Sequence, residues 1–168
     1  MQAALRTLFV AAGALAIALQ VSLLRELTVD LGGDESALGL GLATWLSGIA
    51  AGAWFARVAV RARLSACVTP AFLALACLGV TGVAAGRALR LTLASGPGEL
   101  LSLPRALLLA FVTLAPAGTA VGFLFPALAA LAAREGGAQP IARLYVGESL
   151  GSLAGGATVS LAGASVSP

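Results

Sequence analysis

Glu148 is the residue whose type and position could most readily do chemistry, because it is the only charged residue after Arg143 in a strongly apolar sequence. Tyr145 lies one turn earlier on the same predicted helix face. A carboxylate at membrane depth faces protein or water and is a candidate for proton or solute handling. The alternative is a structural ion pair with an arginine at the membrane edge, where Arg57 and Arg61 come first and Arg143 second. Both roles stay open.

Few other side chains suggest a site. Gln20 lies about one and a half turns before Arg25, and its amide can bond a neighbouring helix or a ligand. The sequence has no His and no Lys, which excludes bis-His haem, imidazole zinc sites and Ser-His-Asp triads. Cys67 and Cys77 are separated by about 15 Å of helix rise, too far for a disulfide. We therefore predict no catalytic, cofactor or metal site.

Small residues recur at every fourth position in two apolar stretches. They are Thr44, Gly48, Gly52 and Ala56 in one, and Gly147, Gly151 and Gly155 in the other. This spacing places them on one helix face, where two backbones can approach closely. Packing within one bundle, a substrate pathway and a subunit interface are the three interpretations. We expect the two glycine faces to pack together and to bring Arg57 towards Glu148.

Two prolines, Pro116 and Pro126, interrupt the longest apolar stretch, with Gly118 and Gly122 between them. Each proline removes a backbone donor and crowds the preceding turn, so the helix is expected to kink or break between them. Broken helices at membrane depth can line transport sites. A long, kinked span without a ligand is the equally weighted alternative.

The composition places these residues in a membrane. Apolar residues make up 60% and charged residues 10% of the 168 residues, and the mean hydropathy is +1.01. A soluble domain carries about 25% charged residues, so this chain has too few to cover a surface in water. The pI near 9.7 comes from ten arginines at predicted membrane edges, and we expect no nucleic-acid partner.

Stretches with few or no charges define the elements that must position these side chains. They span residues 7–24, 36–56, 64–86, 106–133 and about 141–163. A helix needs about 20 apolar residues to cross a bilayer, and these runs lack the alternation of barrel strands. We predict an all-α, polytopic transmembrane bundle of about five spans in a single domain, 1–168. The first stretch is an uncleaved span rather than a signal peptide, and residues 87–105 form an interfacial or re-entrant segment.

The arginines predict the orientation. Six fall on one predicted side, at positions 6, 57, 61, 63, 134 and 143. Four fall on the other, at positions 25, 87, 90 and 105. Because cytoplasmic loops carry the excess of positive charge, the N-terminus is expected in the cytoplasm.

Several segments carry a family resemblance. They are Gln20-Val-Ser-Leu-Leu-Arg25-Glu26-Leu27, residues 32–35, residues 42–52, the proline- and glycine-rich stretch ending in Phe125-Pro126, and residues 144–156 with Tyr145, Glu148 and Gly151. Together they resemble the membrane domain of spermidine-synthase-like bacterial proteins, often described as fused major-facilitator and spermidine-synthase proteins. The soluble synthase part of fused members has no counterpart here, so the resemblance implies no enzymatic activity. It also implies a longer membrane domain, of which residues 1–168 would be a half-length relative or the N-terminal part.

Two functions follow as hypotheses for a protein of the bacterial inner membrane. The first is a transporter-like bundle for a small solute, a cation being one option, with Glu148 near its path. The second is a non-catalytic integral subunit or scaffold within a larger membrane complex. The expected partners are the lipid bilayer and other membrane subunits or further copies of the chain.

Overall fold

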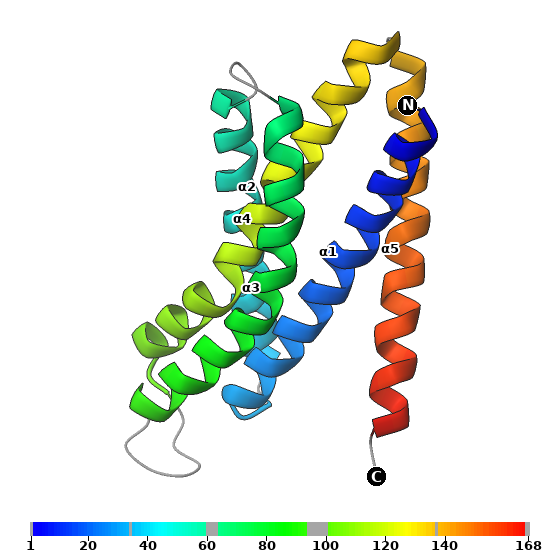
Figure 1. Ribbon diagram of the computed structural model, residues 1–168. Coiled ribbons are helices and arrows are strands. Elements are labelled where there is room, and N and C mark those ends of the chain that lie inside the picture. Colours follow the sequence, from blue (N-terminus) through cyan, green and yellow to red (C-terminus); the bar gives the residue numbers. More distant parts are fainter. Residues whose placement is uncertain (1, 34, 60–63, 94–100, 137, 167–168) are drawn as a thin grey trace.

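The computed structural model describes residues 2–33, 35–59, 64–93, 101–136 and 138–166, for some of which only the backbone is described. These residues form five helices and no strand: α1 (Gln2–Asp30), α2 (Glu35–Ala59), α3 (Leu64–Leu93), α4 (Leu103–Gly136) and α5 (Ala138–Val166). The helices run lengthwise through one bundle, and the two termini lie at opposite ends (Figure 1). The predicted all-α bundle is confirmed.

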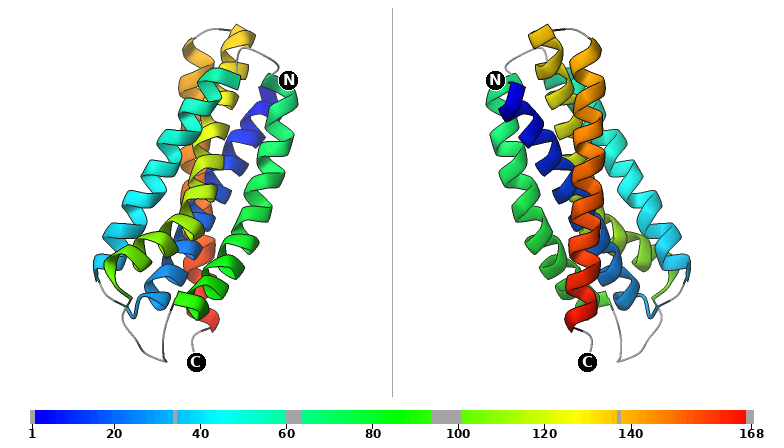
Figure 2. Two further views of the ribbon diagram at one scale, coloured as in Figure 1. Left: turned by 90° about the vertical axis from the view of Figure 1, so that its left-hand side faces the viewer. Right: turned by 90° about the vertical axis from the view of Figure 1, so that its right-hand side faces the viewer.

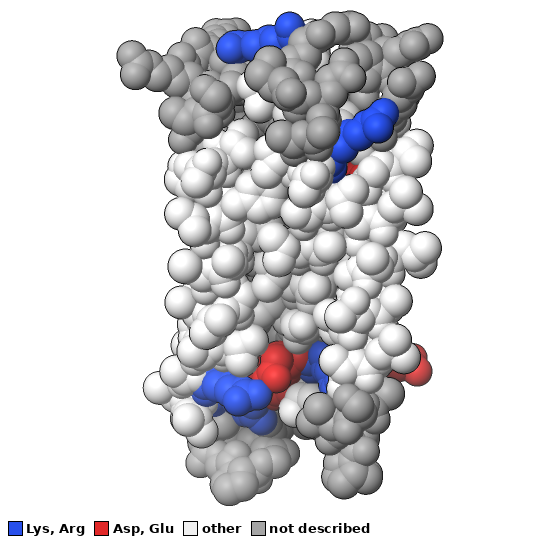
Figure 3. Space-filling model, turned by 45° about the vertical axis from the view of Figure 1, so that its right-hand side comes forward, with Lys and Arg blue, Asp and Glu red and all other residues white. Residues whose placement is uncertain are grey.

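Four of the helices contain segments long and apolar enough to cross a membrane. These segments are Leu5–Asp30, Glu35–Ala59, Val68–Leu93 and Leu103–Arg134. On the face drawn in Figure 3, charged side chains gather near the two ends and a broad uncharged belt separates them. The chain is therefore a multi-pass integral membrane protein. Within the described residues α5 is not among these segments, since Glu148 and several serines and glycines dilute its apolar residues; its crossing stays a prediction.

The helices extend beyond the apolar stretches from which they were predicted. α3 continues past Arg87 and Arg90 to Leu93, so the first part of the expected interfacial segment is ordinary helix, while 94–100 lies outside the described residues. Arg90 Nε donates to the Asp30 carbonyl at 2.7 Å and joins this end of α3 to α1.

α1 ends in a glycine cap. Gly32 and Gly33 both have φ of 80°, and Gly33 N–H donates to the Thr28 carbonyl at 2.8 Å. Glycine adopts this left-handed backbone without a Cβ penalty, which ends the helix and lets the chain turn towards α2.

α4 is one continuous helix that contains both Pro116 and Pro126, and the views show it bent along its length (Figure 2). The predicted kink is confirmed, whereas the expected interruption between the prolines is wrong. Contacts with neighbouring helices hold a proline-containing helix together at membrane depth. α4 is also central to the core, with Leu109, Leu114 and Leu124 fully buried.

The helices do not all pack on α4 to the same extent. α2 and α3 pack on α4, and α5 packs chiefly on α1 (Figure 1). α2 and α5 consequently lie on opposite sides of the bundle.

Candidate functional site

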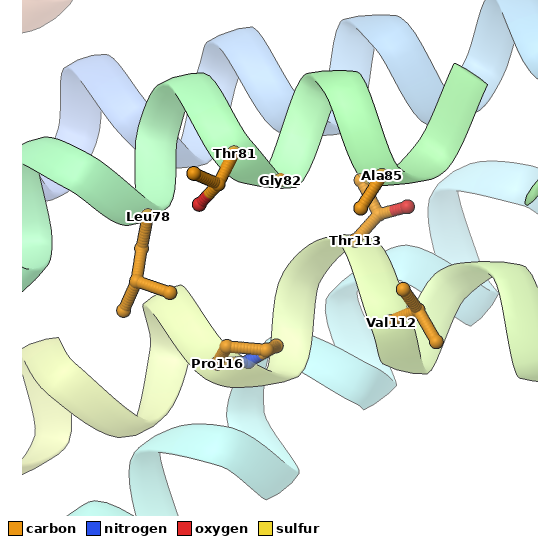
Figure 4. A pocket seen from close by; sticks show the side chains of 7 residues that line it. All are labelled: Leu78, Thr81, Gly82, Ala85, Val112, Thr113 and Pro116. Atoms are coloured by element: carbon orange, nitrogen blue, oxygen red, sulfur yellow. The ribbon is translucent and has the colours of Figure 1, made fainter. Parts of the chain in front are cut away.

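A groove lies between α3 and α4 at the level of the first proline. It consists of two cavities of about 430 Å³ and about 180 Å³, both open to the outside of the bundle and both lined by Leu78 and Pro116. The wider cavity is completed by Phe55, Pro70, Ala71, Ala74, Thr119, Ala120 and Phe123. The narrower one is completed by Thr81, Gly82, Ala85, Val112 and Thr113 (Figure 4). The α3 positions recur every three or four residues, so the groove follows one face of that helix.

The lining of the groove is apolar apart from three threonines. Thr81 Oγ1 donates to the Cys77 carbonyl at 2.9 Å, and Thr119 Oγ1 donates to the Ala115 carbonyl at 2.8 Å. Thr113 Oγ1 is buried and has no hydrogen-bond partner among the described residues. None of the described residues that line the two cavities is charged, and their threonines offer neutral hydrogen-bonding groups within an apolar wall.

The sequence predicted Pro116 as a kink but missed the α3 wall of this groove. α3 carries a proline of its own, Pro70, inside the helix. Small residues opposite a kinked helix were the available indication, because they leave space that larger side chains would fill. Unlike the glycine faces, this series of small residues is interrupted by a large one, Leu78.

The glycine face of α2 lies directly against α4. A Cβ at Gly48 would lie 2.6 Å from the Ala115 carbonyl oxygen, and one at Gly118 would lie 2.7 Å from the Trp45 carbonyl oxygen. At Gly52 and Gly122 the added atom would overlap backbone atoms of the facing helix. The two backbones touch here, which only glycine permits.

The glycine face of α5 lies against α1 in the same way. A Cβ at Gly151 would overlap the Val10 backbone, and one at Gly155 would overlap the Ala14 backbone. Gly147 has more room, since its added Cβ would lie 3.5 Å from Val10 Cγ2. The expectation that the glycine faces of α2 and α5 pack together is wrong: each face packs on a different helix.

The packing of α5 on α1 determines which residues surround Glu148. Its side chain is half-buried, and its carboxylate accepts a hydrogen bond from Ser152 Oγ at 3.2 Å. Arg57 is exposed on α2, and the described ion pairs include none between these two residues. The expected approach of Arg57 fails because α2 and α5 are separated, while the side chains of Arg61 and Arg143 lie outside the described residues.

The remaining candidates are spread over the bundle. Tyr145 is exposed on α5, and Gln20 is half-buried on α1. Arg25 reaches from α1 to α5, where its Nη1 lies 2.6 Å from the position of a Cβ at Gly163. The structure does not gather these residues with Glu148 into one site.

An ion pair that the sequence did not predict joins α1 to α3 near the end of the bundle opposite the N-terminus. Arg87 Nη2 lies 2.9 Å from Glu26 Oε1, and Arg87 Nε also donates to Oε2 at 3.1 Å. Both residues are partly in contact with solvent, so the pair orients the helices more than it stabilises them.

The chain matches no family model, no curated protein and no solved structure. The resemblance to spermidine-synthase-like membrane domains therefore stays a prediction from the quoted segments.

Proposed function

We propose that this membrane protein is transporter-like and that a small solute occupies the groove between α3 and α4. The observation that carries the proposal is the alignment of two cavities along one face of α3, from Pro70 to Ala85, with Leu78 and Pro116 at their junction. Fifteen residues of helix cover about 22 Å, which is most of a hydrocarbon core of about 30 Å.

The groove favours a neutral solute over a cation. Moving a charge into an apolar site is costly unless an opposite charge meets it, and none of the described residues that line the two cavities is acidic. Glu148 lines neither cavity. The proposal includes no enzymatic step; the polar side chains among the described lining residues are threonine hydroxyls.

The proposed setting is the bacterial inner membrane, with the N-terminus in the cytoplasm. Its support is the excess of arginines on the side that contains Arg6 and Arg134. In a variant without Cys67 and Cys77, Arg61→Cys should be shielded from an impermeant thiol reagent in intact cells. Asp34→Cys should react under the same conditions, and the reverse pattern would invert the orientation.

Single cysteines on α3 test the groove. Ala74→Cys and Ala85→Cys, on either side of Leu78, should react with a small water-soluble thiol reagent at least about tenfold faster than Val80→Cys, a difference of about 1.4 kcal/mol in activation free energy. Val80 is the matched control because it lies on the same helix and is 76% exposed on the outer surface of the bundle.

The transporter proposal further requires that the two cysteines react from opposite sides of the membrane. Adding Leu78→Trp should slow both reactions, because the larger side chain fills the junction of the cavities. If Ala74→Cys and Ala85→Cys react no faster than Val80→Cys, the groove is not a solute path.

The second candidate is a non-catalytic subunit of a membrane complex. Its support is the one-sided packing of α5, whose outer surface carries the exposed side chains of Leu150, Leu153 and Leu161. The glycine faces no longer support it, because both are used within the bundle. A stoichiometric partner after purification from native membranes would favour this candidate.

A further inference from the structure

The arginines at the end of the bundle opposite the N-terminus do not all make the same kind of contact. Arg87 and Arg90 of α3 both bond α1, and Arg25 reaches from α1 towards α5. Arg105 instead lies on α4, where it is exposed, and its Nη1 donates to the Leu93 carbonyl of α3 at 3.1 Å. Its guanidinium therefore lies at the end of the seam between α3 and α4.

The narrower cavity of the groove lies along the same seam, and Figure 4 shows its lining side chains between the two helices. A Cβ at Gly86 would lie 2.7 Å from Thr113 Oγ1, so α3 and α4 are in contact beside this cavity. From that contact to the bond between Arg105 and Leu93, α3 advances by seven residues and α4 by eight in the opposite direction, about 10 Å and about 12 Å. Because the two advances are nearly equal, the helices stay side by side from the cavity to the guanidinium.

Arg105 also lies on the face of α4 that lines the groove. It precedes Pro116 by eleven residues, which is close to three turns of helix, so the two residues lie on the same side of α4. The rise between them is about 16 Å, which is about half of a hydrocarbon core of about 30 Å. The seam from the guanidinium to the narrower cavity thus matches one leaflet of a bilayer in length.

The narrower cavity presents an apolar surface to the membrane. It is open to the outside of the bundle, and both helices contain segments apolar enough to span a bilayer. Leu78 and Val112 line its two sides, and Thr81 already donates to the Cys77 carbonyl. A water here would find few polar partners, whereas a hydrocarbon chain needs none, so the bilayer itself supplies the fitting occupant.

We propose that the seam between α3 and α4 binds a phospholipid, with the phosphate at Arg105 and one acyl chain in the narrower cavity. A guanidinium carries five N–H donors in a planar fork that matches phosphate oxygens. Among the described residues Arg105 bonds the Leu93 carbonyl through Nη1, so its other donors can meet the phosphate. The acyl chain covers the open side of the cavity, and the site does not depend on the proposed solute path.

Photolabelling of the protein in a maltoside detergent tests the site, since this detergent contributes no phosphate. The probe is phosphatidylglycerol with a diazirine near the end of one acyl chain. It should label residues 78–85 and 112–116, whereas diacylglycerol with the same chain should label them about tenfold less at equal concentration. Diacylglycerol lacks the phosphate headgroup, so the comparison measures what the phosphate contributes.

Arg105→Gln should lower labelling by the phosphatidylglycerol probe about tenfold, because the charge-assisted hydrogen bonds to the phosphate are lost. Arg25→Gln is the matched control, since it removes the same charge at the same end of the bundle but Arg25 reaches towards α5. Arg105→Lys keeps the charge without the planar fork, and its labelling should fall between those of the parent and Arg105→Gln.

A second pair of variants tests the place of the acyl chain. Ala85→Leu fills the narrower cavity and should lower the labelling of Leu78 and Pro116. Ala84→Leu makes the same change at the neighbouring residue, which is exposed and is not among the described lining residues. It should leave the labelling at the parent level, and equal effects of the two variants would contradict an acyl chain in this cavity.

The site is overturned by equal labelling with the two probes, by unchanged labelling in Arg105→Gln, or by an equal loss in Arg25→Gln. Inorganic phosphate that displaces the probe as effectively as unlabelled phosphatidylglycerol would assign Arg105 to a free anion and also overturn it. If Arg105→Gln does not fold, the two probes on the parent protein decide. Labelling that depends on Arg105, together with slow reaction of Ala74→Cys and Ala85→Cys, keeps the lipid site and removes the solute path; the reverse pattern removes the lipid site alone.

Discussion

Gly52→Ala is expected to cause a large loss of folded protein. The new Cβ would overlap the Thr119 carbonyl oxygen and lie 2.7 Å from Phe123 N and 2.9 Å from Gly122 C. All three are backbone atoms of α4, which cannot rotate away as a side chain could. Overpacking of a filled core lowers stability by about 1–3 kcal/mol. Because the backbone is rigid, we expect this variant at the upper end of that range. The fraction of protein recovered as a monodisperse species should therefore fall steeply.

Gly39→Ala is the matched control for this prediction. It lies on the same helix, and a Cβ there would meet nothing within 4 Å. Alanine is a better helix former than glycine by about 1 kcal/mol, so this variant should be as stable as the parent or slightly more stable. Size-exclusion chromatography and unfolding in denaturing detergent measure both variants. Equal stability of Gly52→Ala and Gly39→Ala would mean that α2 and α4 do not touch at their backbones.

Gly151→Ala is expected to loosen α5 from α1. Its Cβ would overlap the Val10 carbonyl oxygen and lie 2.8 Å from Val10 C, so the two helices must move apart. The expected loss of stability is again about 1–3 kcal/mol. It should affect α5 most, because α5 has few contacts with helices other than α1. Hydrogen exchange of α5 should therefore rise by more than that of α2.

Gly147→Ala provides the comparison one turn earlier on the same face. Its Cβ would lie 3.5 Å from Val10 Cγ2, an ordinary contact that a side chain can accommodate. It should leave the exchange of α5 near the parent level. A uniform rise across all helices in Gly151→Ala, or equal effects of the two variants, would contradict a local attachment of α5 to α1.

The separation of α2 from α5 changes the role open to Glu148. The described contact of its carboxylate is with Ser152 on its own helix, and the described ion pairs include none between Glu148 and Arg57. Glu148 is half-buried on α5. It belongs to the α1–α5 pair, whereas the groove belongs to α3 and α4, so a coupling between the two would pass through the contacts of α1 with α3 and α4 or of α5 with α4.

The sequence by itself determined the helices and their membrane setting. Runs of about twenty apolar residues without alternation can satisfy their backbone groups in a bilayer as helices, and the structure has five helices over the five predicted stretches. The two prolines also predicted that α4 would bend, because the missing N–H is a property of the residue itself. The predicted helices ended too early along the sequence, because backbone hydrogen bonding continues through the flanking arginines.

Only the tertiary structure decided which faces meet. Gly48 and Gly52 have the same four-residue spacing as Gly151 and Gly155, so the sequence could not distinguish their partners; Gly118 and Gly122 of α4 and the backbone of Val10 and Ala14 on α1 provide them. The groove likewise exists only where the small residues of α3 face Pro116. The four-residue repeat of small residues in one helix shows which side of that helix another backbone can approach. Which helix packs there depends on the shapes of the other helices, which meet only when the chain folds.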